Sequence, residues 1–342
     1  MGGFGKFGND LYTGERSINF VGKRRIWYIV AALMILASIV GPALRGGFVF
    51  GIEFRGGSEF QVTNIASLDD DLIANQDLAT ATVEETVADA SPRVTTVGSD
   101  GLRVQTEQLT PEETRGVAVG LAEAFDVTDA DVSASFIGPS WGADITSSAI
   151  RALVVFLILA AIVMSLYFRT WKMSVAANVS LLHDIIITAG VYGILGFEIT
   201  PSAVIGFLTI LGYSLYDTVV VFDKIRENTT EDGPNSSRTF AESVNLAVNQ
   251  TLVRSINTGV VAALPVAAIL FIGSVVLGAG TLRDIALSLF IGILIGTYST
   301  IFIAAPVYSQ LRENEPAIAK RTKRLMAARE ASAAAPAVEK VS

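Results

Sequence analysis

Six long apolar stretches constrain this chain more than any other feature of its sequence. A hydrocarbon core about 30 Å thick requires roughly 20 apolar residues in a helix, so stretches of this length predict membrane spans. They lie at residues 26–44, 152–168, 173–195, 201–222, 256–277 and 285–307. With 51% hydrophobic residues, the 342-residue chain is also too apolar for one soluble core. We therefore expect a polytopic α-helical membrane protein with six transmembrane helices.

A mostly polar segment, residues 45–148, separates the first two apolar stretches. Period-two runs predict strands at 58–66, 93–97, 102–108 and 131–137, and helical periodicity predicts helices at 82–90 and 111–125. The pair Asp100-Gly101 favours a hairpin between the second and third strands. The order strand, helix, strand, strand, helix, strand is that of a ferredoxin-like α+β domain. We expect such a domain between transmembrane helices 1 and 2.

Positive charges gather before the first apolar stretch and after the last one. They are Lys6, Arg16, Lys23, Arg24 and Arg25, and then Arg312, Lys320, Arg321, Lys323, Arg324 and Arg329. The 45–148 domain is rich in Asp and Glu, and the whole chain has a net charge of −8. Because Lys and Arg stay on the cytosolic side, segments 1–25 and 312–342 are predicted to be cytosolic and the domain extracytoplasmic. Beside membrane spans, these basic tails do not indicate nucleic-acid binding.

The polar segment 223–254, between the fourth and fifth spans, is predicted to be a cytosolic loop. It contains a Gly-Pro-Asn turn at 233–235, and its second half, 239–254, is predicted to be a helix lying along the membrane surface. The tail beyond Glu313 is rich in Ala and Lys, which predicts disorder at its end.

The chain has no cysteine, which excludes disulfides, thiolate metal sites and cysteine nucleophiles. It has a single histidine, which makes a poor metal site, and it has no nucleotide-binding GxxxxGK[ST] motif. We therefore expect neither a metal nor an organic cofactor. Any energy must come from an ion gradient or from a partner.

One carboxylate, Asp217, lies inside the fourth apolar stretch. An ionisable group in a membrane span costs at least about 2.5 kcal/mol and usually marks an ion or proton pathway. Gly206, Thr209, Tyr213 and Asp217 follow one another at steps of three, four and four residues, so they share a helix face. This face predicts a buried proton site, although a structural Asp near the cytosolic boundary would give the same pattern.

Arg254 immediately precedes the fifth apolar stretch and is expected at a depth similar to that of Asp217. The two can form an ion pair if their helices adjoin, and protonation of the Asp would then release the Arg. A snorkelling Arg that obeys the positive-inside rule explains the position equally well.

His183 and Asp184 are adjacent in the third apolar stretch. They are secondary candidates for a proton relay, and a structural hydrogen-bonded pair is an equal alternative. In the last stretch, Ser288, Gly292, Gly296 and Thr300 recur at four-residue steps, which indicates close helix packing. The segment GIEFRGG at 51–57 predicts a tight backbone turn into the external domain.

Three of these segments together resemble a known family. They are GIEFRGG after the first span, the His-Asp pair in the third, and above all GYSLYDTVVVFDKIREN at 212–228, with TLVRS at 251–255 as a fourth match. They are similar to the SecD/SecF family of bacterial Sec translocon accessory subunits, part of the resistance–nodulation–division superfamily. The resemblance covers nearly the whole chain. The chain differs from the family at position 216, where it has Tyr and the family commonly has Asn.

This resemblance implies a non-enzymatic subunit of the bacterial cytoplasmic membrane that couples the proton-motive force to preprotein translocation. It implies SecD, the SecYEG channel and the translocating preprotein as partners, with protons as the coupling ion. The family's functional Asp and Arg match Asp217 and Arg254. The alternative is a proton-driven exporter of lipids or small molecules from the same superfamily. Such exporters usually carry twelve spans and two large external domains in one chain.

Overall fold

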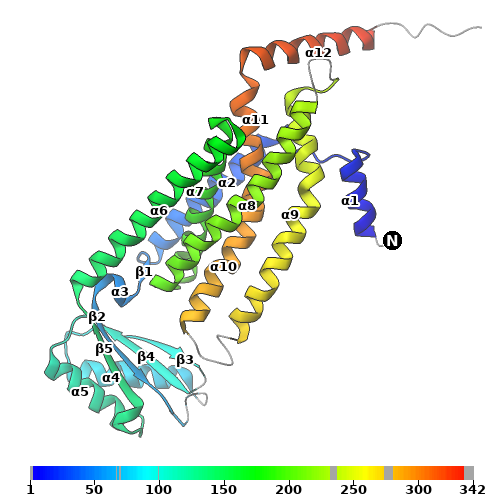
Figure 1. Cartoon of the computed structure of the whole chain (residues 1–342). Coiled ribbons are helices and arrows are strands. Elements are labelled where there is room, and N and C mark those ends of the chain that lie inside the picture. Colours follow the sequence, from blue (N-terminus) through cyan, green and yellow to red (C-terminus); the bar gives the residue numbers. More distant parts are fainter. Residues whose placement is uncertain are drawn as a thin grey trace, which may run out of the picture.

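The computed structural model describes residues 3–66, 68, 71–98, 100–231, 237–272 and 280–334. A bundle of long helices forms one part, and a small α/β domain lies at one end of it (Figure 1). Two further helices, α1 (Gly3–Thr13) and α12 (Pro316–Ala334), lie toward the opposite end. Neither of these two helices was predicted from the sequence. The last residues, 335–342, where disorder was predicted, lie outside the described residues.

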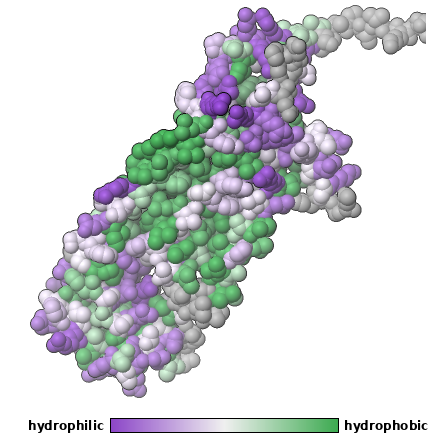
Figure 2. Space-filling model, viewed as in Figure 1, coloured by the Kyte–Doolittle hydropathy of each residue, from purple (hydrophilic) through white to green (hydrophobic). Residues whose placement is uncertain are grey.

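Within the described residues, six helical segments are long and apolar enough to span a membrane, as predicted. They are α2 (Arg24–Leu44), α6 (Pro139–Phe168), α7 (Trp171–Leu195), α8 (Pro201–Glu231), α9 (Phe240–Phe271), and α10 (Gly280–Ser299) continued by η3 (Thr300–Ala304) and α11 (Ala305–Glu313). On the face shown in Figure 2, a hydrophobic band lies across the bundle between two polar ends. Part of the predicted fifth span, 273–277, lies outside the described residues.

The segment 223–254 does not form the predicted loop, and its second half does not form a separate surface helix. Residues 223–231 continue α8, and 240–254 are the first half of the unbroken helix α9. Thr239 starts α9 with a capping box to Glu242. Phe240, Val244 and Val248 then pack into the core of the bundle, so the apolar face of this segment contacts protein. The Gly-Pro-Asn turn at 233–235 lies outside the described residues.

The α/β domain lies between α2 and α6. Its elements are β2 (Gly57–Val62), α4 (Leu72–Thr86), β3 (Arg93–Val97), β4 (Gly101–Thr106), α5 (Pro111–Ala124) and β5 (Val132–Ile137). The four strands form an antiparallel sheet in the order β3-β4-β2-β5, and β3 and β4 are the predicted hairpin. Its core joins Phe60 and Val104 of the sheet to Val83 and Leu121 of the two helices.

The first helix of this domain begins ten residues earlier than predicted and ends at Thr86 instead of residue 90. Asp71 caps α4 by accepting a hydrogen bond from the Ala74 N–H, 3.0 Å away. The first turns of α4 contain the polar residues Asn75, Gln76 and Asp77, so they lack the apolar periodicity that predicts a helix. The helix ends where the backbone of Val87 becomes extended.

The small-residue stripe of the last span packs against a matching stripe of α8. Gly206 faces Ser288 and Gly292 faces Ile210, so closely that a Cβ at either glycine would collide with its neighbour. Further along, a Cβ at Gly296 would lie 3.2 Å from Ser214, and the Thr218 and Thr300 hydroxyls are 3.0 Å apart. Both stripes repeat every four residues, which is the ridge spacing that interlocks two helices. The predicted packing role of this stripe is confirmed.

A short joint connects the α/β domain to the bundle. β1 (Val49–Phe50) pairs in parallel with β6 (Glu198–Ile199), which connects α7 to α8, and α3 (Ile52–Arg55) follows β1. Gly56 and Gly57 then turn the chain into β2 with φ values of +78° and +146°, which confirms the predicted backbone turn. Across the joint, Arg93 of β3 donates to the Gly196 carbonyl oxygen at 3.3 Å.

Two carboxyl groups of this joint are buried without a hydrogen-bond partner on one oxygen each, among the described residues: Glu53 Oε2 and Glu198 Oε1. Burial is the main cause that raises the pKa of Glu53, and the carboxylates of Glu198 and Glu59 raise it further, whereas Arg103 opposes the shift. Burial likewise raises the pKa of Glu198, with Asp284 adding to the shift. The Gln105, Arg103 and Arg93 side chains oppose it.

We expect the joint to weaken as pH rises. Both groups bind a proton more readily in the folded state, so their contribution is fully present below the unfolded-state pKa, near 4.5, and is lost as pH rises through the folded-state pKa. The thermal unfolding midpoint of the detergent-purified protein, measured across this pH range, should fall. The double variant Glu53→Gln/Glu198→Gln should remove that part of the slope, whereas the exposed Glu84→Gln should keep it. Equal slopes in both variants would contradict this expectation.

Candidate functional site

Helix α8 places Asp217 in the interior of the bundle. The helix starts at Pro201, and the Thr200 hydroxyl accepts a hydrogen bond from the Ala203 N–H at 3.1 Å, so its first turn is capped. Asp217 lies sixteen residues further along, about 24 Å from the start at 1.5 Å per residue. Its side chain is only 4% exposed.

The two carboxylate oxygens of Asp217 have different surroundings. Oδ1 accepts a hydrogen bond from the Ser255 hydroxyl of α9 at 3.0 Å, and Ser255 is itself buried. Oδ2 is buried and has no hydrogen-bond partner among the residues that the structure describes. A buried carboxylate oxygen without a donor is costly, so Oδ2 is open to a proton or to a cationic partner.

The other residues predicted on this site are only partly brought together. Arg254 is on α9, next to Ser255, but its side chain is exposed, and among the described residues no hydrogen bond or ion pair joins it to Asp217. Tyr213 is half-buried among α9 and α10 side chains, and its hydroxyl is buried without a described partner. Thr209 is exposed and donates to the Ile205 carbonyl oxygen at 2.7 Å. Asp217 and Tyr213 thus lie inside the bundle, whereas Thr209 and Arg254 lie at its surface.

His183 and Asp184 form a second buried polar group, on α7. The His183 ring nitrogen Nδ1 is 3.3 Å from Asp184 Oδ1, so these neighbours are in contact. The Ser214 hydroxyl of α8 donates to Asp184 Oδ2 at 2.6 Å. Asp184 is fully buried and His183 is 3% exposed, with its Nε2 left without a described partner.

Further buried hydroxyl groups pair across helices near the two carboxylates. Ser180 donates to Ser299 at 2.8 Å, and Thr218, the neighbour of Asp217, is 3.0 Å from the Thr300 hydroxyl. Thr300 begins η3, a π-helical turn of the last span, and such turns occur frequently at functional sites. Ser214 and Thr218 are one helical turn apart on α8, where Ser214 contacts Asp184 of α7 and Thr218 follows Asp217 directly.

These hydroxyl residues were not predicted from the sequence as part of the site. Ser180, Ser214, Thr218, Ser299 and Thr300 lie inside apolar stretches and Ser255 directly precedes one, and only Thr300 was singled out, as a packing residue. One signal was present, because Ser214 and Thr218 are four residues apart and flank Asp217. Buried carboxyl groups with hydroxyl neighbours can bind, hold and release protons. Among the described residues, no three His, Cys, Asp or Glu side chains gather as a metal site.

The fold and the site define a class of protein. It is a polytopic membrane protein that has ionisable groups inside its helical bundle and a folded domain between its first two spans. Residues 120–314 match the family described as "Protein export membrane protein SecD/SecF, C-terminal". The chain belongs to this SecD/SecF family, as its sequence motifs had predicted.

Similar proteins cover nearly all of the chain. It is 43% identical over 337 residues to the protein translocase subunit SecF of Streptomyces coelicolor, a match that covers 98% of this chain and 87% of that protein. It is 39% identical to the SecF subunit of Mycobacterium tuberculosis, covering 95% of this chain and 74% of that one.

Solved structures show the same likeness. The crystal structure of SecDF from Thermus thermophilus, described as a translocon-associated membrane protein, matches with a TM-score of 0.73 at 28% identity. The match covers 87% of this chain and 39% of that chain, so the present chain spans about two fifths of SecDF. SecDF in a super-membrane-facing form matches with a TM-score of 0.58 over 93% of this chain and 40% of the other.

Proposed function

We propose that this chain is a SecF-type subunit that works with SecD and the SecYEG channel, and that proton binding at Asp217 drives its part in preprotein translocation. Membership of the SecD/SecF family and near full-length similarity to SecF subunits support the role in protein export. The observation that carries the proton step is the environment of Asp217. It is a buried carboxylate with one hydroxyl donor on Oδ1 and no described partner on Oδ2.

The protonated and deprotonated forms of Asp217 need different neighbours. A proton on Oδ2 satisfies that oxygen and leaves the Ser255 hydrogen bond on Oδ1 intact. After the proton leaves, the charged group needs a cation, and Arg254 is one residue from Ser255, about 100° around α9. We expect the Arg254 guanidinium to move toward Asp217 in that state, or a SecD residue to take its place. Proton transit would then change the contact between α8 and α9.

The arrangement in the membrane is part of the same proposal. The α/β domain has the element order and sheet order that support a ferredoxin-like class, with its strands in the order β3-β4-β2-β5. We place it on the extracytoplasmic side of a bacterial cytoplasmic membrane and both termini in the cytosol. The distribution of Lys and Arg supports this orientation.

Co-purification tests the assembly. An affinity-tagged full chain, extracted in mild detergent from its own host, should recover SecD in stoichiometric amount and the channel subunits in smaller amount. The matched control is an unrelated six-span protein with the same tag at the same level. Recovery of neither SecD nor the channel, beside a folded and membrane-inserted chain, would refute the SecF-type role.

A further inference from the structure

The N-terminal helix α1 lies alongside α9, whose residue Ser255 donates to the buried carboxylate of the candidate site (Figure 1). Two glycines show how the helices are aligned. A Cβ built on Gly14 would lie 3.8 Å from a Leu246 side-chain carbon. A Cβ built on Gly8 would lie 3.2 Å from a Val253 methyl carbon. The two helices are therefore antiparallel, and α1 reaches α9 two residues before Ser255.

The same helix also contacts α8, so it bridges the two helices that hold the candidate site. The Tyr12 ring centre is 6.0 Å from the Lys224 ammonium of α8, which is a cation–π distance. The Tyr12 carbonyl oxygen accepts a hydrogen bond from the Gln250 side chain of α9 at 3.3 Å. Leu11 is fully buried, in a hydrophobic cluster that it shares with residues of α8 and α9.

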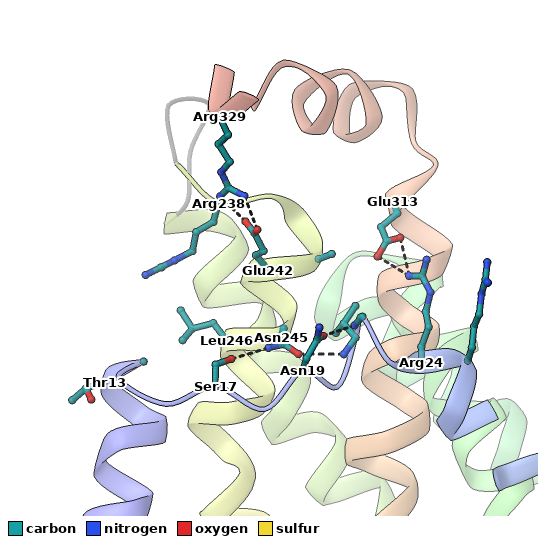
Figure 3. Close-up of a pocket in the computed structure, with 15 residues that line it drawn as sticks. Thr13, Ser17, Asn19, Arg24, Arg238, Glu242, Asn245, Leu246, Glu313 and Arg329 are labelled. Atoms are coloured by element: carbon teal, nitrogen blue, oxygen red, sulfur yellow. Dashed lines mark hydrogen bonds and ion pairs between the residues drawn. The ribbon is translucent and has the colours of Figure 1, made fainter. Parts of the chain in front are cut away.

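The segment that follows α1 is anchored to α9 by hydrogen bonds. The Asn245 side-chain oxygen accepts from the N–H groups of Phe20 and Val21 at 2.8 and 3.2 Å. Its amide nitrogen donates to the Ser17 hydroxyl and the Ile18 carbonyl oxygen at 3.2 and 3.0 Å. Figure 3 shows Ser17 facing Asn245 across this contact. The anchor holds the chain in place beyond the end of α1, whether α1 is docked or not.

Helix α1 itself is intrinsically weak and is joined to the anchor by a flexible turn. Gly14 follows its last residue with a φ of +82°, and residues 12–16 are exposed. Gly3, Gly5 and Gly8 lie within its 11 residues, and glycine is among the least favourable residues in a helix. Helices shorter than about 12 residues are marginal in isolation. The helical form of α1 therefore depends on its contacts with α8 and α9.

We propose that α1 is a strap that holds α8 against α9 while it is docked, and that it must be released before the contact between these two helices can change. The inference rests on the proposed function, in which proton transit at Asp217 alters that contact. Docked α1 ties Lys224 of α8 to Gln250 and Val253 of α9. Release by rotation about Gly14 removes these bridges, uncovers the cluster around the Leu11 position and lets the two helices separate near the end of the bundle opposite the α/β domain.

A disulfide tests the strap directly, because the chain has no cysteine of its own. A Cβ at Gly8 would lie 3.7 Å from the Val253 Cβ, and ordinary disulfides have Cβ–Cβ distances of about 3.5–4.5 Å. Gly8→Cys/Val253→Cys should therefore cross-link on oxidation, and the second substitution removes the methyl groups that would crowd the first. A locked chain cannot reach the released state, so cross-linking about nine tenths of the chains should lower export about tenfold in the vesicle assay. Reduction should restore export.

A tether of the same geometry at the other end of the bundle is the control. A Cβ at Gly41 of α2 would lie 3.8 Å from the Ile194 Cβ of α7. Oxidised Gly41→Cys/Ile194→Cys should support export as well as its own reduced form does. Undiminished export with the tether between positions 8 and 253 demonstrably closed would overturn the proposal, and so would an equal loss with the control tether.

Hydrogen exchange of the purified, unsubstituted chain is a second measurement, and it does not depend on how the cysteine variants fold. If α1 leaves α9 and unfolds, the amides of residues 7–13 should exchange at least about tenfold faster than those of residues 244–252, which stay packed in α9. Equal protection of the two segments would overturn the proposal.

The tether and the Asp217→Asn variant together separate the strap from the proton step. Loss of export with the tether closed, beside normal export by Asp217→Asn, would support the release of α1 and reject the proton role. Normal export with the tether closed, beside failure of Asp217→Asn, would reject the strap alone and leave the proposed function intact.

Discussion

Replacing Asp217 by Asn should leave the protein inserted and assembled but reduce its stimulation of protein export to the level seen without the chain. The Asn side chain keeps the shape of Asp and can still accept the Ser255 hydrogen bond on Oδ1. It cannot titrate, so any step that needs a proton on this side chain stops. The expected cost in folding is about 1–3 kcal/mol at most, because the amide nitrogen replaces an oxygen that has no described partner.

The measurement is export of a reporter preprotein in cells that lack the native subunit, together with translocation into membrane vesicles with and without a proton gradient. Asp223→Asn is the matched control, since Asp223 lies on the same helix but is exposed. It should support export like the unchanged protein. If Asp217→Asn restores export fully and keeps its dependence on the gradient, the proton role of Asp217 is wrong. The side chain at position 217 would then have a structural role in the translocation complex, for which the shape shared by Asp and Asn is sufficient.

Replacing Arg254 separates the charge of this side chain from its shape. Arg254→Ala should abolish gradient-dependent export, because Asp217 would lose the cation that we propose for its charged form. Arg254→Lys should also be impaired, by about tenfold or more, since an ammonium does not present the paired donors of a guanidinium. The same vesicle assay measures both variants, with Arg226→Ala on the exposed C-terminal part of α8 as the control.

The pattern across the two Arg254 variants decides between the alternatives. Normal export with Lys and failure with Ala would mean that a positive charge suffices and that the paired donors of the guanidinium are not needed. Normal export with Ala would show that Arg254 only snorkels at the membrane surface, in agreement with its exposed side chain. A cation supplied by another subunit would then have to stabilise the charged form of Asp217.

Local sequence patterns were sufficient for most of the fold. The apolar lengths predicted the six candidate spans, and period-two runs placed the four strands of the α/β domain within a few residues. These patterns arise because each segment must bury its own apolar residues, so they can be recognised from the composition of that segment alone. Helix ends were less well predicted. The early start of α4 and the continuation of α9 into residues 240–254 depend on caps and on packing partners far along the chain.

The candidate site shows the same division. Asp217, His183 and Asp184 could be singled out because charge inside an apolar stretch is costly wherever the chain folds. Their hydrogen-bond partners could not be predicted, because serines such as Ser255 and Ser214 are common in helices. They contact the carboxylates only because α8 packs against α9 and α7. The exposed position of Arg254 likewise depends on how α9 is rotated against α8.

The sequence by itself thus determined the membrane class, the α/β domain and the carboxylates that must be satisfied, because hydrophobic length and buried charge are properties of single segments. The tertiary structure alone decided which hydroxyl reaches which carboxylate and that Arg24 before the first span meets Glu313 after the last. Those relations join residues up to some 300 positions apart, as in the Arg24–Glu313 pair, whose separation is 289. Contacts between residues so far apart in the sequence are determined by helix packing. A local sequence pattern cannot predict them.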